Sequence, residues 1–350
     1  MSSLALKRDV ASGDSADDSL SPTSTVIDGP IGKKIKVFDL NVVQNNKKTN
    51  FPKVLHDPSS KQGWENLDDL EKISVDAGKA IEEFRNYENS ARQSIVQVHY
   101  TEMRKNQTVA KVDYFYKKYH TFNKCEMTVW EGFEALKGYV DSSDPDSDLP
   151  NLEHMLQTAE GIRAAGYPDW MQLVGLLHDM GKIMYLWGNE EDGQIGRADF
   201  PQWALGGDTW IVGVPIPKTA VFPQLNLLNP DKNIPMYQGK CGMYSSKCGL
   251  ENLKFAYGHD EYMYRMLLHN KTLIPKEGLA MIRYHSCYPL HKENEYKELL
   301  APGDEELLQW VREFNQFDLY TKADKRPDVI SLWPYYQNLI DKYLPGTLKW

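Results

Sequence analysis

Hydrophobic residues recur at helical spacing through most of the chain. After Pro168, for example, Trp170, Leu173, Val174 and Leu177 stand at positions i, i+3, i+4 and i+7, which places them on one helix face. Short polar segments separate such stretches, so the pattern predicts a mainly α-helical, single-domain bundle. The predicted helices run through His154 to about Ala165, from Pro168 to Asp179, and over about 259–270, 275–286, 304–318 and 331–343.

Two stretches lack this pattern. Residues 1 to about 60 are rich in Ser, Asp, Gly, Pro and Lys and contain no aromatic residue before Phe38. This composition predicts a disordered tail over residues 1–60. Residues 188–258 are rich in Gly, Pro and Asn and contain short apolar pieces, which predicts an irregular excursion or a small hairpin. The helical domain is then expected to span residues 61–350.

Composition and charge exclude several classes of function. The chain has 350 residues, a net charge of −9 and no clustered basic face, so we expect no nucleic-acid partner. No stretch approaches the ~20 apolar residues of a membrane span, and the N-terminus has no apolar signal segment. The four cysteines form no close CxxC pair, which is typical of reduced thiols. We therefore expect a soluble, cytoplasmic monomer with no membrane partner.

Four histidines and two aspartates lie on apolar helix faces or at helix ends. Asp318 continues the apolar stripe formed by Leu307, Val311 and Phe314. Burying an unpaired carboxylate is costly, so Asp318 needs a partner, which is a metal ion, a buried Arg or a helix N-terminus. The six candidate metal ligands are His154, His178, Asp179, His259, His285 and Asp318.

Each candidate also has an ordinary structural interpretation. A single buried histidine is more often a hydrogen-bonded core residue than a ligand, and the pair His178-Asp179 also suits an exposed helix end. The apolar string VGLL before His178 favours burial. Imidazoles with carboxylates suit iron, manganese or zinc and disfavour structural zinc, which prefers thiolates. The residues alone predict a mono- or dinuclear metal site. The other histidines, with mostly polar neighbours, are His56, His99, His120, His269 and His291.

The strings around these candidates resemble a known family. His154, the pair His178-Asp179 and a distant Asp318 resemble the HD-domain superfamily. More closely, the chain from about Trp64 to its last residue is similar to the myo-inositol oxygenase family. The strings that carry this resemblance are FRNY (84–87), DSSDPDSDLPN (141–151), HMLQTAEGIR (154–163), VGLLHDMGK (174–182), PQWALGGDT (201–209), GMYSSKCGLEN (242–252), GHDEY (258–262), MIRYHSCYP (281–289), EFNQFDLYTK (313–322) and PYYQNLIDKYLPGTLKW (334–350).

The resemblance implies an HD-like helical fold and a non-haem di-iron enzyme. It implies that the ring of myo-inositol is cleaved with O₂ to give D-glucuronate, the first step of inositol catabolism. One iron would then be bound by His154, His178, Asp179 and Asp318. The other would be bound by Asp179, His259 and His285, with Asp179 bridging. The second iron has fewer protein ligands, which leaves positions for substrate and O₂.

The resemblance also implies a substrate site. Carboxylates there would accept hydrogen bonds from ring hydroxyls, and Arg, Lys and Ser would donate them. Lys182 is expected to accept a hydroxyl proton, because burial and nearby cations lower the pKa of a lysine. Without the family context, Lys182 is a solvated cation at a helix end. The implied substrate contacts are Arg85, Asp141, Lys182, Asp208, Ser286 and Lys322.

Two rival functions share parts of this pattern. An HD-superfamily phosphohydrolase would use His154, His178, Asp179 and Asp318 to attack phosphorus with a metal-bound hydroxide. A phosphate site usually contains several convergent cations, whereas the implied substrate site mixes Asp with Arg and Lys. A catalytically inactive binding protein would keep the fold, but the presence of all six candidate ligands argues against it. Residues 188–200 look longer than the family's usual link and are expected to form an extra surface loop near the pocket.

Overall fold

The computed structural model describes two N-terminal strands and most of the chain from residue 85 to residue 350. Gaps in the second part fall at 86, 89, 91, 138, 146–149, 198 and 321–326. The chain divides into two units, Met1–Phe51 and Pro52–Trp350. Among the predicted site residues, Lys322 lies outside the described residues.

The first unit contains one described hairpin. Strand β1 (Ser24–Asp28) pairs antiparallel with β2 (Lys34–Phe38), so that Ser24 lies opposite Phe38 and Asp28 opposite Lys34. The sequence pattern did not predict these strands. The remaining residues up to 60 lie outside the described part of the chain, so the disordered tail stays a prediction.

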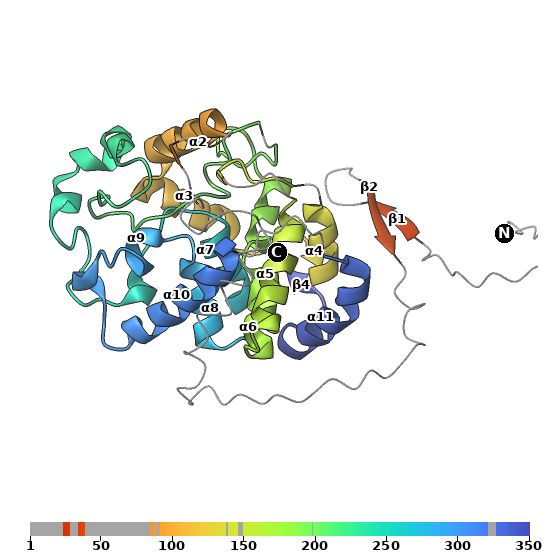
Figure 1. Cartoon of the computed structure of the whole chain (residues 1–350). Coiled ribbons are helices and arrows are strands. Elements are labelled where there is room, and N and C mark those ends of the chain that lie inside the picture. Colours follow the sequence, from red (N-terminus) through yellow and green to blue (C-terminus); the bar gives the residue numbers. More distant parts are fainter. Residues whose placement is uncertain are drawn as a thin grey trace, which may run out of the picture. The chain divides into compact units, whose positions relative to one another are not determined.

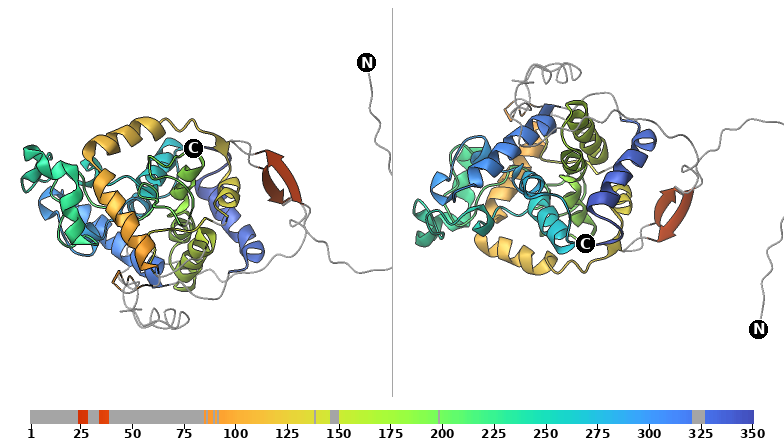
Figure 2. Two further views of the ribbon diagram at one scale, coloured as in Figure 1. Left: turned by 90° about the horizontal axis from the view of Figure 1, so that it is seen from above. Right: turned by 90° about the horizontal axis from the view of Figure 1, so that it is seen from below.

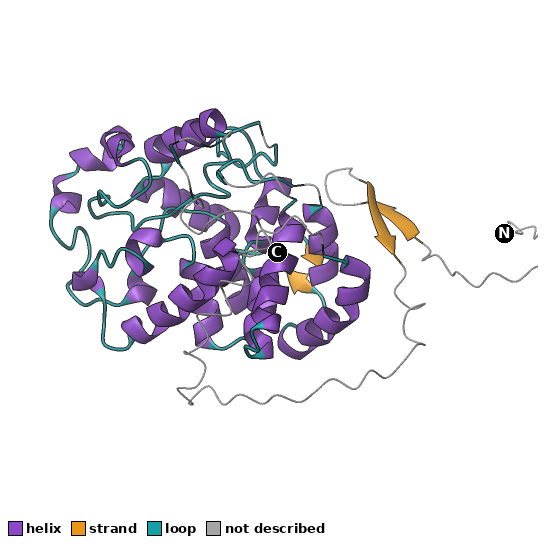
Figure 3. Cartoon of the chain, viewed as in Figure 1, coloured by secondary structure: helices purple, strands orange, loops and turns teal. Residues whose placement is uncertain are grey.

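The second unit is mainly helical, as predicted (Figures 1 and 3). None of its described helices is long and apolar enough to span a bilayer. The α-helices are α2 (Gln93–Asn106), α3 (Val109–Tyr119), α4 (Val129–Leu136), α5 (Asn151–Ala164), α6 (Asp169–Leu177), α7 (His259–His269), α8 (Lys276–Tyr284), α9 (Tyr288–His291), α10 (Asp304–Tyr320) and α11 (Val329–Tyr343). The 3₁₀-helices are η6 (Met180–Leu186), η7 (Pro223–Leu228), η8 (Pro230–Asn233), η9 (Pro235–Gln238), η10 (Leu250–Asn252) and η11 (Lys297–Leu299), and the short strands are β3 (Glu126–Met127) and β4 (Leu348–Lys349).

Local sequence signals account for several helix ends. The hydroxyl of Thr128 accepts a hydrogen bond from the Glu131 backbone N–H, and the Glu131 carboxylate accepts one from the Thr128 N–H at 2.8 Å. This reciprocal capping box starts α4. Helix α5 ends just before Gly166, which has a φ of +78°. Pro168 precedes the first turn of α6. The bounds of α5 and α6 match the predicted helix boundaries to within a few residues.

Helices α5 and α6 lie side by side at the centre of the second unit (Figure 2). Helix α10 packs on α5, α11 packs on α6, and α8 packs on α6, α7 and α10. The core between these elements is apolar and closely packed, with Leu173, Val174, Leu176 and Leu177 of α6 fully buried. This arrangement brings the ends of α6 and α8 and the start of α7 to one place.

The segment 188–258 is irregular, as predicted, but its described residues form no hairpin. It contains η7 to η10, and one isolated β-bridge joins Ile211 to Phe255. Its buried apolar residues contribute to a second, smaller core cluster that also includes Tyr284, Leu299 and Leu308. The excursion is thereby held against α8 and α10.

Candidate functional site

The six predicted metal ligands converge on one point. His154 comes from α5, His178 caps the C-terminus of α6, and Asp179 precedes η6. His259 is the first residue of α7, His285 caps the C-terminus of α8, and Asp318 lies in α10. The side chains of His178, Asp179, His259 and His285 are almost completely shielded from solvent. The structure therefore brings the six candidate ligands together, and their role as metal ligands stays a prediction.

Asp179 lies between two groups of histidines. Its Oδ1 lies 3.0 Å from His259 Nε2 and 3.9 Å from His285 Nε2. Its Oδ2 lies 3.8 Å from His154 Nε2 and 3.7 Å from His178 Nε2. The two oxygens of one carboxylate therefore face different pairs of imidazoles, which is the arrangement of a bridging ligand.

Asp318 belongs to one of these groups. Its Oδ1 lies 2.9 Å from His154 Nε2 and 3.2 Å from His178 Nε2. One group of donors is therefore His154, His178, Asp179 and Asp318. The other is Asp179, His259 and His285, whose ligand atoms all lie within 4.8 Å of one another.

Backbone carbonyls fix the orientation of three imidazoles. The Nδ1 atoms of His178, His259 and His285 lie 2.8, 2.6 and 2.9 Å from the carbonyl oxygens of Gly175, Leu205 and Ile282. Because a carbonyl only accepts, each Nδ1 carries the hydrogen and each Nε2 turns a lone pair toward the centre. The buried His178 Nε2 has no well-aligned hydrogen bond of its own. Such a donor set fits a divalent cation of the iron, manganese or zinc type.

The ionisation of Asp179, Asp318 and His285 suits metal binding. Burial raises the pKa of Asp179, but Lys182 and the neighbouring histidines outweigh it and hold the pKa well below its usual range. Asp318 behaves in the same way through His178 and His154. Burial, with His259 and His178 close by, lowers the pKa of His285 to about 3. Asp179 and Asp318 are therefore ionised and His285 is neutral. Burial lowers the pKa of His178, but the charges of Asp179 and Asp318 outweigh it and raise the pKa, so a bound cation would displace a proton there.

A glycine allows the two groups to approach each other. A Cβ atom on Gly181 would lie 2.0 Å from the carbonyl oxygen of His259. Only glycine therefore lets η6 lie directly against the start of α7. This contact keeps Asp179, two residues earlier, within reach of His259.

Two residues that the sequence interpretation missed support His285. The Nε2 of His291 donates to the His285 carbonyl at 2.9 Å, and Asn315 Nδ2 donates to the same oxygen at 3.2 Å. His291 is buried, although its sequence neighbours suggested a polar setting. Asn315 lies three residues before Asp318 on α10, so the two side chains are neighbours on one helix face. This spacing could have pointed to Asn315 from the sequence.

A pocket opens beside the metal ligands and contains the described substrate candidates. Its volume is about 110 Å³. One water molecule needs about 10–15 Å³ on this scale, so the pocket has room for a small ligand. Its lining includes five of the residues predicted to contact substrate, which are Arg85, Asp141, Lys182, Asp208 and Ser286. It also includes Tyr87, Tyr100, Asn151 and Tyr288, which the sequence interpretation did not single out.

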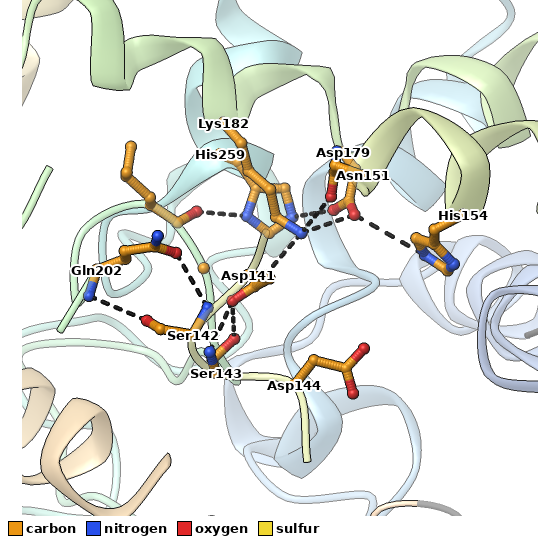
Figure 4. Close-up of polar contacts among 12 residues, drawn as sticks. Asp141, Ser142, Ser143, Asp144, Asn151, His154, Asp179, Lys182, Gln202 and His259 are labelled. Atoms are coloured by element: carbon orange, nitrogen blue, oxygen red, sulfur yellow. Dashed lines mark hydrogen bonds and ion pairs between the residues drawn. The ribbon is translucent and has the colours of Figure 1, made fainter. Parts of the chain in front are cut away.

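Lys182 is held by three oxygen atoms at the edge of this pocket (Figure 4). Its Nζ lies 2.7 Å from Asp141 Oδ2, 2.7 Å from Asp179 Oδ2 and 3.2 Å from Asn151 Oδ1. Burial lowers the pKa of Lys182, but the charges of Asp141 and Asp179 outweigh it and raise the pKa above its ordinary value. A solvated cation was the wrong alternative, since Lys182 is buried. We also expected a lowered pKa for Lys182. Among the protein's own side chains this is wrong, because Asp141 and Asp179 raise the pKa.

A second ion pair lies across the pocket. The Arg85 guanidinium binds the Asp208 carboxylate with both terminal nitrogens, and the Nη1–Oδ1 distance is 3.2 Å. The same guanidinium lies 3.4 Å above the ring of Tyr288. Asp208 is held further because its backbone N–H donates to the Tyr100 hydroxyl at 3.0 Å. Both cationic side chains of the described pocket lining, Arg85 and Lys182, are therefore paired with carboxylates, and they form no cationic cluster.

Comparison with known proteins agrees with this site. A family described as Myo-inositol oxygenase matches residues 93–350, the part of the chain that holds all six candidate ligands. The chain belongs to the myo-inositol oxygenase family. Among its relatives, the inositol oxygenase of Mus musculus is 46% identical over 281 residues, which cover 79% of this chain and 94% of the relative. The inositol oxygenase of Dictyostelium discoideum is 40% identical over 317 residues, covering 88% and 100%. That of Homo sapiens is 44% identical over 281 residues, covering 79% and 94%.

Membership of this family confirms the resemblance found in the sequence. It also agrees with the helical architecture. The inserted segment 188–200 is only partly as expected. Asp192, Gly193 and Gln194 are buried rather than at the surface, and no described residue of the segment lines the pocket.

Proposed function

We propose that this chain is an inositol oxygenase that cleaves the ring of myo-inositol with O₂ to give D-glucuronate, the first step of inositol catabolism. The observation that carries the proposal is the position of Asp179. Its two oxygens face separate pairs of histidines at the edge of a small polar pocket. A dinuclear metal site beside a polyol-sized pocket, in a member of this family, supports oxygenase chemistry.

We assign two irons to the two groups of donors. One is bound by His154, His178, Asp179 and Asp318, and the other by Asp179, His259 and His285. When bound, the irons supply the redox chemistry with O₂ and attract substrate oxygens. The second group offers fewer protein ligands, which leaves coordination positions for substrate and O₂.

The pocket residues bind and orient the polyol. Asp141 and Asp208 accept hydrogen bonds from ring hydroxyls, and Arg85, Lys182 and Ser286 donate them. Lys322, which lies outside the described residues, is assigned to the same donor set. Because Arg85 and Lys182 already pair with carboxylates, the pocket suits a neutral ligand.

Lys182 is the proposed proton acceptor for a substrate hydroxyl, and Asp179 is its partner. In its contacts with Asp141 and Asp179 the amine is held as an ammonium ion. Coordination through Asp179 Oδ2 would end one of these contacts and weaken the hold on the proton. The ammonium ion can then release its proton to water, and the neutral amine can accept the proton of the substrate hydroxyl that it orients.

We also propose that the enzyme acts as a cytoplasmic monomer. All six proposed ligands come from one chain, so the site needs no second copy. The four cysteines Cys125, Cys241, Cys248 and Cys287 are free, which fits a reducing compartment.

The rival functions fit the geometry less well. A phosphohydrolase would share His154, His178, Asp179 and Asp318, but the pocket presents Asp141 and Asp208 to the ligand. Two carboxylates would repel a phosphate. A binding protein without catalysis would not need six candidate metal ligands that converge on one point.

The deciding experiment loads the purified chain with Fe(II) without oxygen and then adds myo-inositol and O₂. Glucuronate should form, and it should not form when O₂ or iron is left out. His269→Gln, a change on the exposed end of α7, serves as a control that keeps full activity. Phosphate release from nucleotides, with no glucuronate, would favour the hydrolase instead.

A further inference from the structure

Helix α2 places a buried histidine behind the wall of the substrate pocket. His99 is fully buried, and it is not among the residues that line the pocket. Its Nδ1 lies 3.1 Å from Ser142 Oγ, and its Nε2 lies 3.2 Å from the Gly206 carbonyl oxygen. Ser142 follows Asp141, and Gly206 lies two residues before Asp208. One imidazole therefore connects the two loops that carry the pocket carboxylates.

The hydrogen bonds of this imidazole form a consistent set. The Gly206 carbonyl only accepts, so His99 Nε2 carries the hydrogen and Nδ1 accepts from the Ser142 hydroxyl. The Ser142 oxygen in turn accepts from the Gln202 backbone N–H at 3.3 Å, and Gln202 Oε1 accepts from the Ser142 N–H at 3.1 Å (Figure 4). The donor and the acceptor of each of these hydrogen bonds are defined, so the ring holds both loops in one arrangement.

Two glycines make this connection close. A Cβ on Gly206 would lie 2.6 Å from Asp141 Oδ2. A Cβ on Gly207, whose φ is +95°, would lie 2.7 Å from His99 Nε2. The backbone at 206–207 is therefore in contact with His99 on one side and with Asp141 on the other. Because closely packed backbone separates the two groups, a shift of the His99 imidazole would displace the Asp141 carboxylate as well.

The next residue of α2 holds the other carboxylate. The Tyr100 hydroxyl accepts a hydrogen bond from the Asp208 N–H at 3.0 Å, and the rings of His99 and Tyr100 are in edge contact, with centroids 5.3 Å apart. Adjacent residues of one helix thus set the places of Asp141 and Asp208.

We propose that His99 is a positioning residue that fixes the spacing between Asp141 and Asp208, and thereby the fit of a cyclic polyol that donates hydroxyls to both. This inference rests on the proposed function. Burial lowers the pKa of His99 to about 4, which keeps the ring in its neutral form. Because the ring is buried behind the wall, its effect is on substrate binding rather than on the chemical step.

The test compares His99→Leu with His99→Gln in the iron-loaded enzyme. Leu removes both hydrogen bonds, whereas a Gln amide offers one donor and one acceptor at similar spacing. We expect Leu to raise the KM for myo-inositol about tenfold, which corresponds to about 1.4 kcal/mol, with a smaller change in kcat. Gln should return the KM to within about twofold of the unchanged chain.

Two further variants separate positioning from general stability. Ser142→Ala removes only the Asp141-loop partner of His99, and its effect on KM should not add to that of His99→Leu, because both break the same contact. Tyr336→Phe removes a buried hydrogen bond on α11, from the Tyr336 hydroxyl to Glu160 at 2.7 Å, and should lower the melting temperature without changing KM. Iron content and melting temperature are measured for every variant.

The outcomes are distinct. If the unchanged chain forms no glucuronate, the proposed function fails and the inference fails with it. If the unchanged chain is active but His99→Leu keeps its KM, or loses kcat alone, the inference fails by itself. Should His99→Leu not fold, Ser142→Ala decides, and an unchanged KM in that variant overturns the role of His99.

Discussion

The Nε2 atoms of His259 and His285 lie 3.0 Å apart and face each other with lone pairs. Both Nδ1 atoms are committed to backbone carbonyls, so neither ring is free to place a hydrogen between them while both are neutral. Two lone pairs at this distance repel unless a proton or a metal cation lies close to both. Burial and the neighbouring histidines disfavour protonation of His285, so a metal cation is the natural partner.

Adding metal to the chelated protein should therefore raise its melting temperature. Free Fe(II) at about one hundred times its dissociation constant adds about 2.7 kcal/mol to the free energy of unfolding. In a domain of this size that corresponds to roughly 5–10 °C. The measurement is thermal unfolding without oxygen, with and without Fe(II). His269→Gln should keep the full shift, and the absence of any shift in the unchanged chain would contradict a metal site here.

The proposed bridging role of Asp179 predicts unequal losses of iron. Asp179→Ala removes a ligand from both groups, so iron content should fall close to zero. Asp318→Ala removes a ligand from one group only, so about one iron per chain should remain. Elemental analysis of the reloaded variants measures both. Two irons and full activity in Asp179→Ala would exclude the bridge.

Lys182→Met should destabilise the metal-free chain strongly. It leaves Asp141 and Asp179 buried without their cation, and breaking a buried pair in this way costs about 3–5 kcal/mol. The matched control is Lys342→Met, which breaks a largely exposed pair with Asp169 and should cost about 0–1 kcal/mol. Urea unfolding gives both values. If both variants lost the same free energy of unfolding, burial of the Lys182 ion pairs would not contribute to stability in the way proposed.

The inserted segment should matter for stability and not for substrate binding. Asp192 is buried and receives hydrogen bonds from Lys111 at 2.6 Å, Lys118 at 2.7 Å and Tyr114 at 3.0 Å. Asp192→Asn should lower the free energy of unfolding by about 1–3 kcal/mol. Its KM should not change, because the described residues of the insertion do not reach the pocket. Asp199→Asn, in an exposed pair with Arg197, is the control, and a raised KM in Asp192→Asn would reverse this assignment.

Acid should destabilise the fold partly through His99. Burial lowers the pKa of His99 from 6.5 to about 4. Between these pH values the unfolded chain binds a proton that the folded chain does not, so the free energy of unfolding falls as the pH falls. In His99→Gln this pH dependence should be shallower by at most about 1.4 kcal/mol per pH unit. Urea unfolding of both proteins across this window tests it, and parallel curves would show that His99 is protonated in the fold.

The candidate metal ligands could be predicted from the sequence for a physical reason. Helix phasing places Asp318 on the stripe of Val311 and Phe314, and those neighbours are buried in the structure. The proposed substrate contacts were predicted differently, because they came from the strings shared with the family and not from helical periodicity. His99 could not be found in either way. Its partner Gly206 is 107 positions away, and no local pattern records a contact between segments so far apart.

Asp192 in the inserted segment and Lys182 show the same limit of prediction from sequence. Asp192 lies in a polar string that indicates a surface loop, but three side chains of α3 bury it. The ionisation of Lys182 depends on Asp141, which lies on a different loop. In each case the property belongs to a pair of residues, and only the folded chain brings the pair together.

The spread of the ligands along the chain sets an order of assembly during synthesis. His259 and His285 are 26 positions apart, whereas His154 and Asp318 are 164 positions apart. A chain that emerges from the ribosome N-terminus first completes the group of Asp179, His259 and His285 before Asp318 has been added. The four-residue group can form only after Asp318 has been added. The two groups therefore become available to a metal ion at different points of synthesis, the three-residue group first.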